Sequence, residues 1–173
     1  MLKKTALILF VLISNINLFA KECSLSYSTM YLIAMNERAT EKEIGYPYLI
    51  SFNKRKDAQE AKKIHKELFL NNRTLDCKNV ESCTKILSSL LANGSDNLDL
   101  GAFQINYHFH KIPISHYFKI DKSYSKSCEI AEKFIDKNNV TFEDLARYHS
   151  STKKYNAKYA RALEINYNKI VSR

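Results

Sequence analysis

Residues 30–37 of the chain read MYLIAMNE, and this stretch decides how the rest of the sequence is interpreted. Met30, Ile33 and Ala34 recur at the spacing of one face of an α-helix, and Glu37 follows on the same stripe. Serine and threonine side chains just before the stretch are suited to capping the start of a helix. The stretch therefore predicts a helix whose core-facing stripe ends in a carboxyl group.

That position makes Glu37 the candidate catalytic residue. A carboxyl group on a core-facing stripe is shielded from water, which disfavours its charged form. A neutral carboxylic acid near pH 7 is what a general acid needs to break a glycosidic bond. The alternative is a surface glutamate in a fraying last turn, where Arg38 and Glu41 also lie. Spacing alone leaves both interpretations open.

Outward from this stretch, the chain is predicted to form further helices joined by short polar links. Apolar residues at intervals of three and four predict helices over residues 56–71, 80–92, 123–136, 141–148 and 155–170. The residues expected to be buried are Ala58, Ala61, Ile64 and Leu68 in the second helix of the chain and Tyr155, Tyr159, Ala162, Tyr167 and Ile170 in the last. The sequence contains no internal repeat and no linker, so it predicts one mainly α domain.

Two segments depart from helical periodicity. Residues 48–52 are rich in β-forming side chains and are expected to form one arm of a small hairpin. Residues 103–110 alternate apolar and polar side chains, and this period of two favours a strand or irregular structure. The predicted fold is therefore mainly α with a small β element.

The N-terminus has the layout of a secretory signal peptide. Lys3 and Lys4 precede an apolar run over residues 7–13, and we place cleavage after Ala20. The run is shorter than the ~20 apolar residues that span a bilayer, although an uncleaved anchor remains the alternative. The domain is therefore expected over residues 21–173, with no stable membrane anchor after cleavage. Removal of these two lysines, and of no acidic residue, lowers the formal net charge from +9 to +7.

Composition excludes several classes of protein. The chain of 173 residues is 45% hydrophobic and 26% charged, as in globular domains rather than disordered chains. The chain has three glycines and no tryptophan, which excludes a collagen-like sequence. So few glycines also make a glycine-rich phosphate-binding loop improbable. The positive charge suits nucleic acid, an anionic membrane or an acidic polymer. An exported protein meets lipid head groups and cell-wall polymer before nucleic acid, so we expect no nucleic-acid partner.

Four cysteines lie in the predicted mature chain, namely Cys23, Cys77, Cys83 and Cys128. In an oxidising compartment an even number predicts two disulfides, with three possible connectivities. A zinc site is the rival interpretation, but the spacing of Cys77 and Cys83 is wider than the usual ligand spacing.

Three histidines, His108, His110 and His116, form a second candidate group for a metal. No acidic residue lies between the first two, and the helical H-x-x-x-H spacing is absent. We therefore predict neither a metal nor a cofactor.

Three blocks in a characteristic order resemble the lytic transglycosylases, which have a goose-lysozyme-like catalytic domain. Residues 31–37 (YLIAMNE) resemble the family's helix ending in its catalytic glutamate. Residues 100–106 (LGAFQIN) resemble its Gly-Leu-Met-Gln-Ile-Asn block, and residues 145–150 (LARYHS) resemble a variant of its Ala-Tyr-Asn-Ala-Gly block. The resemblance spans about residues 23–170 and implies a lysozyme-like fold with a helical insertion at about residues 54–95. In that fold the glutamine block is a loop that enters a short helix.

The resemblance also implies an activity and a set of site residues. By this resemblance, Glu37 is expected to act as general acid and then general base, and to cut the bond between N-acetylmuramic acid and N-acetylglucosamine with a 1,6-anhydro product. No second carboxylate is required where the N-acetyl group of the substrate stabilises the developing charge. Tyr148 is expected to orient Glu37. The other implied substrate-binding residues are Gln104, Asn106, His149 and, as apolar walls, Tyr48 and Phe103.

The most similar subgroup comprises small exported transglycosylases of type IV and type III secretion machines, the Cag-gamma type among them. It implies a Cys23–Cys128 disulfide, which leaves Cys77 to pair with Cys83. It also implies a periplasmic protein with peptidoglycan and a secretion apparatus as partners. The family usually has serine or threonine after the catalytic glutamate, where Arg38 stands here. This departure keeps a second hypothesis open, a catalytically weak or inactive peptidoglycan-binding component on the same fold.

Overall fold

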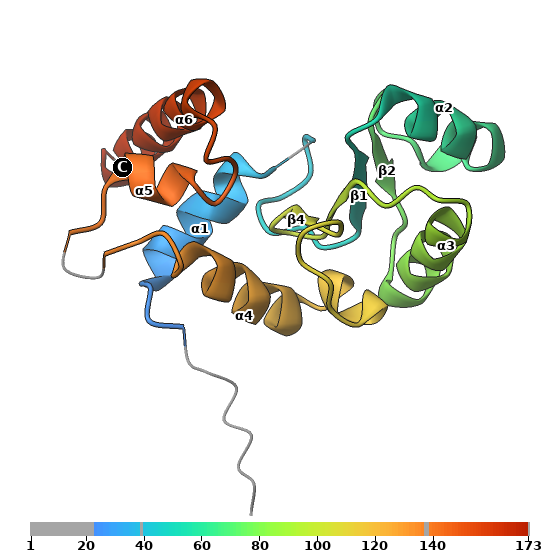
Figure 1. The fold of residues 1–173 in the computed structure, drawn as a ribbon, viewed down its shortest axis with the longest axis horizontal. Coiled ribbons are helices and arrows are strands. Elements are labelled where there is room, and N and C mark those ends of the chain that lie inside the picture. The colour runs from blue at the N-terminus through green and yellow to red at the C-terminus, as the bar shows by residue number, and fades with distance from the viewer. Residues whose placement is uncertain (1–22, 39, 137–138, 173) are drawn as a thin grey trace, which may run out of the picture.

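The computed structural model describes residues 23–38, 40–136 and 139–172, so the predicted signal peptide lies outside the described residues. Within these ranges the chain is mainly helical, as predicted, with one small sheet (Figure 1). The α-helices are α1 (Tyr27–Asn36), α2 (Arg55–Ile64), α3 (Val80–Ala92), α4 (Ile120–Ala131), α5 (Phe142–Ala146) and α6 (Lys153–Val171). Two short 3-10 helices, η1 (Lys66–Leu68) and η2 (Ile114–Phe118), complete the helical content of these ranges.

Helix α1 forms where the opening stretch predicts it. The Ser26 side chain accepts a hydrogen bond from the Thr29 backbone N–H at 3.1 Å and so caps the helix. Met30 and Ile33 are fully buried on the predicted stripe. Glu37 follows as the C-cap residue, and its backbone N–H donates to the Ile33 carbonyl at 2.9 Å. The carboxyl group therefore stands at the end of a helix that the core holds in place.

The sheet has four antiparallel strands in the order β2-β1-β3-β4. The strands are β1 (Leu49–Phe52), β2 (Thr74–Asp76), β3 (Leu98–Leu100) and β4 (Ile105–Asn106). The predicted hairpin arm is the interior strand β1, with Ile50 opposite Leu75 on one side and Leu100 on the other. All four β1 residues are buried, because the sheet lies inside the core.

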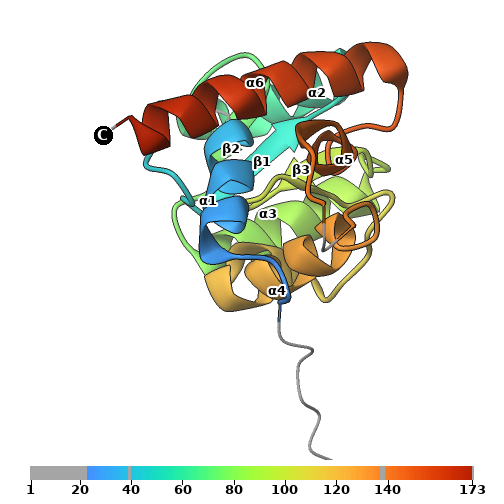
Figure 2. The same cartoon turned by 90° about the vertical axis from the view of Figure 1, so that its left-hand side faces the viewer.

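The elements form two halves joined along one side. Figure 1 places the sheet with α2 and α3 on one side and α1, α5 and α6 on the other, with α4 below them. Turned by 90°, the molecule shows α6 passing across α1 (Figure 2), and these two helices are in contact. One continuous hydrophobic core runs through both halves.

Two disulfides join the described cysteines. The Cys23–Cys128 bond ties the segment before α1 to α4 across 105 residues of sequence. The Cys77–Cys83 bond closes the short loop that leads from β2 into α3. Both pairs are those that the family resemblance implies, and two disulfides are compatible with an exported protein.

The predicted helix over residues 56–71 was wrong in its second half. The helix ends at Ile64, and Ile64 itself is 69% exposed rather than buried. Beyond it Phe69 forms a bridge to Leu75, and the Leu70 N–H donates to the Thr74 carbonyl. The segment turns back because it pairs with β2, and this long-range pairing overrides the local helical pattern.

The buried stripe predicted for the last helix was also wrong in part. Tyr155 and Tyr167 are 57% and 45% exposed, whereas the buried residues are Tyr159, Ala160 and Leu163. This narrower stripe is a regular helical face, and the outer tyrosines lie beyond its two ends.

The two remaining segments differ from expectation at their boundaries. The helix predicted over residues 123–136 is α4, and the chain leaves it in turns over residues 132–134. Of the alternating segment, residues 105–106 alone form a strand, β4, and turns follow in place of the short helix that the resemblance implied.

The described residues include no helix with the length and apolar character needed to cross a membrane.

Gly101 provides a test of how tightly the turn after β3 is packed. Its φ is +73°, and a Cβ atom there would lie 2.0 Å from the Tyr117 carbonyl oxygen. We expect Gly101→Ala to lower the free energy of unfolding by about 3 kcal/mol or more, since backbone strain and overpacking add. Gly94→Ala is the matched control, because φ is +81° with no atom within 4 Å, and its cost should be about 1 kcal/mol. Urea unfolding followed by circular dichroism measures both, and equal losses would contradict the close approach.

Candidate active site

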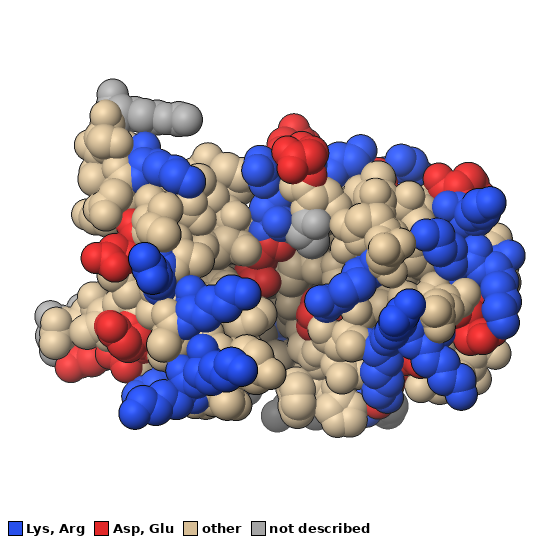
Figure 3. All heavy atoms as spheres, turned by 90° about the horizontal axis from the view of Figure 1, so that it is seen from above, with Lys and Arg blue, Asp and Glu red and all other residues tan. Residues whose placement is uncertain are grey.

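A cleft lies between the two halves of the molecule. It consists of two neighbouring hollows of about 520 and 340 Å³. Both hollows are lined by Glu37, Asp99, Gln104 and His149. Seen from above, the surface is hollowed between the halves, and Lys and Arg side chains stand on both sides of the hollow (Figure 3). Glu37 and His149 belong to the helical half, and Asp99 and Gln104 to the half with the sheet.

The Glu37 side chain is 10% exposed and is held by a residue from the far end of the chain. The Tyr159 hydroxyl, from α6, donates to Glu37 Oε1 at 2.7 Å. This bond links residues 122 apart in sequence. The periodicity of the last helix predicts Tyr159 on its buried face, but no local pattern shows that α6 crosses the end of α1, so the site role of Tyr159 was not predicted.

His149 completes the surroundings of Glu37. Its Nδ1 lies 3.5 Å from Glu37 Oε1, and its ring stacks on Tyr159 with centroids 4.7 Å apart and an interplanar angle of 4°. The contact with Glu37 raises the pKa of His149, although partial burial of the ring opposes the shift. Burial and the negative charge of Glu37 raise the pKa of Tyr159 well above 10, so its hydroxyl remains a donor.

Tyr148 was expected to orient Glu37, but its hydroxyl bonds elsewhere. It donates to the Phe103 carbonyl oxygen at 2.7 Å and accepts from Ser127 Oγ at 3.0 Å. Burial, followed by the charge of Glu37, raises the pKa of Tyr148 well above 10, so its hydroxyl stays protonated. Tyr148 therefore lines the cleft and connects the turn that carries Phe103 to α4, while Tyr159 makes the orienting contact.

Gln104 has a backbone conformation that is uncommon for a residue other than glycine. Its φ is +46°, in the left-handed region, and its Nε2 donates to the Gly101 carbonyl at 2.8 Å. That bond fixes the amide within the turn after β3. Strained backbone of this kind occurs often at functional sites, and Gln104 lines both hollows of the cleft.

Asn106 lines the cleft as the resemblance implies, but its amide is committed to its neighbours. Its Nδ2 donates to Asp99 Oδ1 at 2.8 Å and to Asn97 Oδ1 at 3.0 Å. Asp99 is a second carboxyl group in the cleft, and the sequence patterns did not predict it there. The three-residue strand β3 is too short for its alternation to show which face Asp99 occupies.

Tyr48 and Phe103 do not form walls of this cleft. Phe103 is 4% exposed and packs against Tyr124, with ring centroids 5.9 Å apart. Tyr48 packs edge-on against Tyr46 at 5.4 Å. Phe103 belongs to the hydrophobic core and Tyr48 packs against it, and neither residue lines either hollow.

The segment predicted as an insertion, residues 54–95, contributes to the sheet and to the cleft. It supplies β2, which pairs with β1, and it supplies Asn71, Asn72 and Arg73 to the wall of the larger hollow. The Arg73 guanidinium donates to the Phe52 carbonyl at 2.9 Å and to Asn53 Oδ1 at 3.0 Å.

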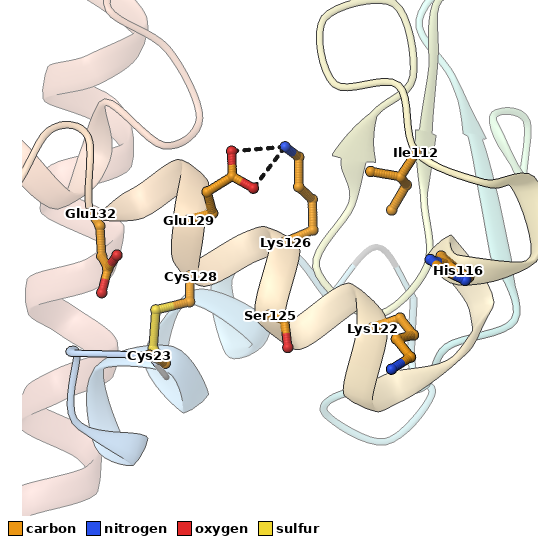
Figure 4. Close-up of a pocket in the computed structure, with 9 residues that line it drawn as sticks. All are labelled: Cys23, Ile112, His116, Lys122, Ser125, Lys126, Cys128, Glu129 and Glu132. Carbon is orange, nitrogen blue, oxygen red and sulfur yellow. Dashed lines mark hydrogen bonds and ion pairs between the residues drawn. A yellow bond between two sulfur atoms is a disulfide. The ribbon is translucent and has the colours of Figure 1, made fainter. Parts of the chain in front are cut away.

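The described residues contain one cluster of side chains with the spacing of metal ligands, Cys23, Cys128 and Glu132. Its two sulfur atoms are joined in a disulfide and provide no thiolate for a metal. This cluster borders a separate hollow of about 360 Å³ along α4 (Figure 4), where Lys126 pairs with Glu129 at 2.9 Å. That hollow shares no lining residue with the cleft. Of the candidate histidines, His108 pairs with Asp96 at 2.8 Å.

None of the family models, curated proteins and solved structures compared with the chain matches it.

The pairing of His149 with Glu37 predicts a pH-dependent contribution to stability. Because the folded-state pKa of His149 lies above its usual 6.5, the contribution is present below about pH 6.5 and is lost as the pH rises through the raised pKa. We expect His149→Gln to reduce the free energy of unfolding more at pH 6 than at pH 9. Urea titrations of both proteins at the two pH values measure this, and an equal reduction would contradict the ion pair.

Proposed function

We propose that the chain is a lytic transglycosylase with a lysozyme-like fold, which cuts the β-1,4 bond between N-acetylmuramic acid and N-acetylglucosamine in peptidoglycan. One observation carries the proposal. A nearly buried glutamate ends a core helix, has one oxygen held by a tyrosine, and stands in a polar cleft between two halves of the molecule. The three sequence blocks that resemble the family contribute Glu37, Gln104 and His149 to this one cleft.

Glu37 supplies the acid and base chemistry of the proposed reaction. Glu37 begins the reaction in its protonated form: its proton passes to the glycosidic oxygen, and the electron pair of the breaking C1–O bond stays with that oxygen. The muramyl C6 oxygen then bonds to C1, and the proton of that hydroxyl returns to the Glu37 carboxylate. Atoms balance without water, and one group acts in both steps. Tyr159 holds Oε1 throughout, so Oε2 is the oxygen that faces the reacting bond.

The rest of the cleft fits a polar polymer. Its lining is dominated by amide, carboxyl and imidazole groups, which suit the hydroxyl and acetamido groups of sugars. Arg38 and Arg73 line the larger hollow, where they can attract the lactyl or peptide carboxylates of peptidoglycan. We propose that Arg38 takes the place of the serine or threonine at this point and binds a carboxylate instead of a sugar hydroxyl.

The proposed setting is the periplasm, where the enzyme opens the wall locally for a secretion apparatus. Two disulfides and a basic mature chain support an exported protein that acts on an acidic polymer.

Replacement of Glu37 tests the chemistry and the residue together. We expect the mature protein to release anhydromuropeptides from purified sacculi and Glu37→Gln to release none, because the amide carries no acidic proton. Mass spectrometry of the digests detects the products, and circular dichroism confirms that the variant is folded. Equal release by both proteins would contradict the assignment. Sacculus binding by the wild type with no release would instead identify a non-catalytic wall-binding component.

Removal of the Tyr159 hydroxyl tests the orienting contact. We expect Tyr159→Phe to lower kcat by about 10- to 100-fold, because a misplaced acid loses alignment with the glycosidic oxygen. The control is Tyr167→Phe on the same helix, where the ring packs against Phe142 and should keep full activity. Initial rates of product release measure both, and a Tyr159→Phe variant as fast as the control would exclude the orienting role.

A further inference from the structure

A basic hollow of about 480 Å³ adjoins the cleft on the half of the molecule that carries the sheet and α2 (Figure 1). Helix α2 contributes Arg55 and Lys62 to its lining, and the segment before β2 contributes Asn72 and Arg73. Asn72 and Arg73 also line the larger hollow of the cleft. The basic hollow is therefore a continuation of the cleft, and the reaction as described so far does not use it.

The charged residues that line the basic hollow are all cations, namely Arg55, Lys62 and Arg73. Both hollows of the cleft, by contrast, are lined by the carboxyl groups of Glu37 and Asp99. None of the three cations forms an ion pair within 4.0 Å with an acid of the described residues. The basic hollow therefore has a positive charge that the protein itself does not neutralise, and such a site favours an anionic ligand.

Two other lysines of α2 provide the contrast. Lys56 and Lys63 line a different hollow, between α2 and α3, and that hollow also contains the acids Asp57 and Glu60. Lys63 pairs with Glu60 at 2.7 Å. One helix therefore carries lysines that lie among acids and, in the basic hollow, cations that have no acid beside them.

The basic hollow also has an aromatic floor. Phe52 lines it, and the Phe52 ring stacks on Phe69 with centroids 5.7 Å apart. Lys62 Nζ lies 5.5 Å from the centroid of the Phe69 ring. The Arg73 guanidinium donates to the Phe52 carbonyl and to Asn53 Oδ1, and it retains further N–H groups for a ligand. Cations above an apolar floor suit a ligand that carries both carboxylates and small apolar groups.

From these observations we propose that the basic hollow binds the acidic peptide attached to the muramyl sugar, so that the enzyme prefers glycan strands that still carry their peptides. The inference rests on the proposed function, in which the muramyl sugar lies beside Glu37. The peptide begins at the lactyl group of that same sugar, and the shared border of Asn72 and Arg73 leads from the larger hollow into the basic one. The carboxylates of the peptide then meet Arg55 and Lys62, and its small apolar groups meet the aromatic floor.

Two soluble substrates prepared from the same sacculi test this preference. An endopeptidase that cuts the cross-links gives strands that carry peptides, and an amidase gives strands without them. We expect the wild type to have about a tenfold higher kcat/KM on the strands that carry peptides, measured as release of anhydro products. Arg55→Gln/Lys62→Gln should lower kcat/KM on these strands about tenfold, the size expected for two exposed charge contacts, and leave it unchanged on strands without peptides. High salt should reduce the preference of the wild type, because it screens exposed charges.

The matched control is Lys56→Gln/Lys63→Gln. It removes the same two positive charges from the same helix, but on the side of the other hollow, and should keep the full preference. Circular dichroism checks that each variant is folded. Should the double variant of the basic hollow melt early, Arg55→Gln alone changes one exposed residue at the start of α2 and should lower the preference about threefold. Arg73 is left unchanged, because it holds Phe52 and Asn53 in place.

Each outcome decides the role of the basic hollow. A preference for strands with peptides that is lost in the folded variants, and kept in the control, supports it. A wild type that cuts both substrates equally well overturns the peptide preference and leaves the proposed function standing. An equal loss on both substrates, or an equal loss in the control, also overturns it, because either result assigns the charges to general attraction. A wild type that releases no anhydro product from either substrate overturns the proposed function and the preference with it.

Discussion

The hydrogen bond from Tyr159 to Glu37 is the contact on which the arrangement of the site depends. It joins the end of the first helix to the interior of the last, 122 residues apart. Tyr159 is itself 8% exposed and belongs to the buried stripe of α6 that includes Leu163. The position of the acid is therefore set by core packing, and any change in how α1 meets α6 displaces the carboxyl group.

The opposite wall depends on a different constraint, the tight turn between β3 and β4. Gly101 lets the backbone approach Tyr117 closely, and Gln104 then adopts its left-handed conformation three residues later. The same turn brings Asn106 back beside Asp99, where it donates to the carboxylate. One wall is thus a helix end held by apolar packing, and the other is a short sheet edge held by amide hydrogen bonds.

Local signals in the sequence predict the parts of this structure that local interactions determine. The α1 stripe, its serine cap and the end of α3 at Asn93 follow from periodicity and capping alone. The second half of the helix predicted over residues 56–71 fails, because Phe69 pairs with Leu75 across a turn. The positions of Tyr159 and Asp99 in the cleft were not predicted, for the same physical reason. Their places in the cleft depend on contacts with Glu37 and Asn53, which lie far away in sequence, and no short pattern encodes such contacts.

Three partly or fully buried acids in this molecule differ in how many charged and polar groups surround their carboxylates. Asp76 has two lysines and a tyrosine hydroxyl, so its charge is neutralised and it serves the fold. Glu37 has one histidine and one tyrosine, which hold it without enclosing both oxygens. Asp99 accepts hydrogen bonds from two amide groups, and the nearby charge of His149 acts on it more weakly. Compensation thus decreases from the interior toward the cleft, in a chain whose overall charge is positive.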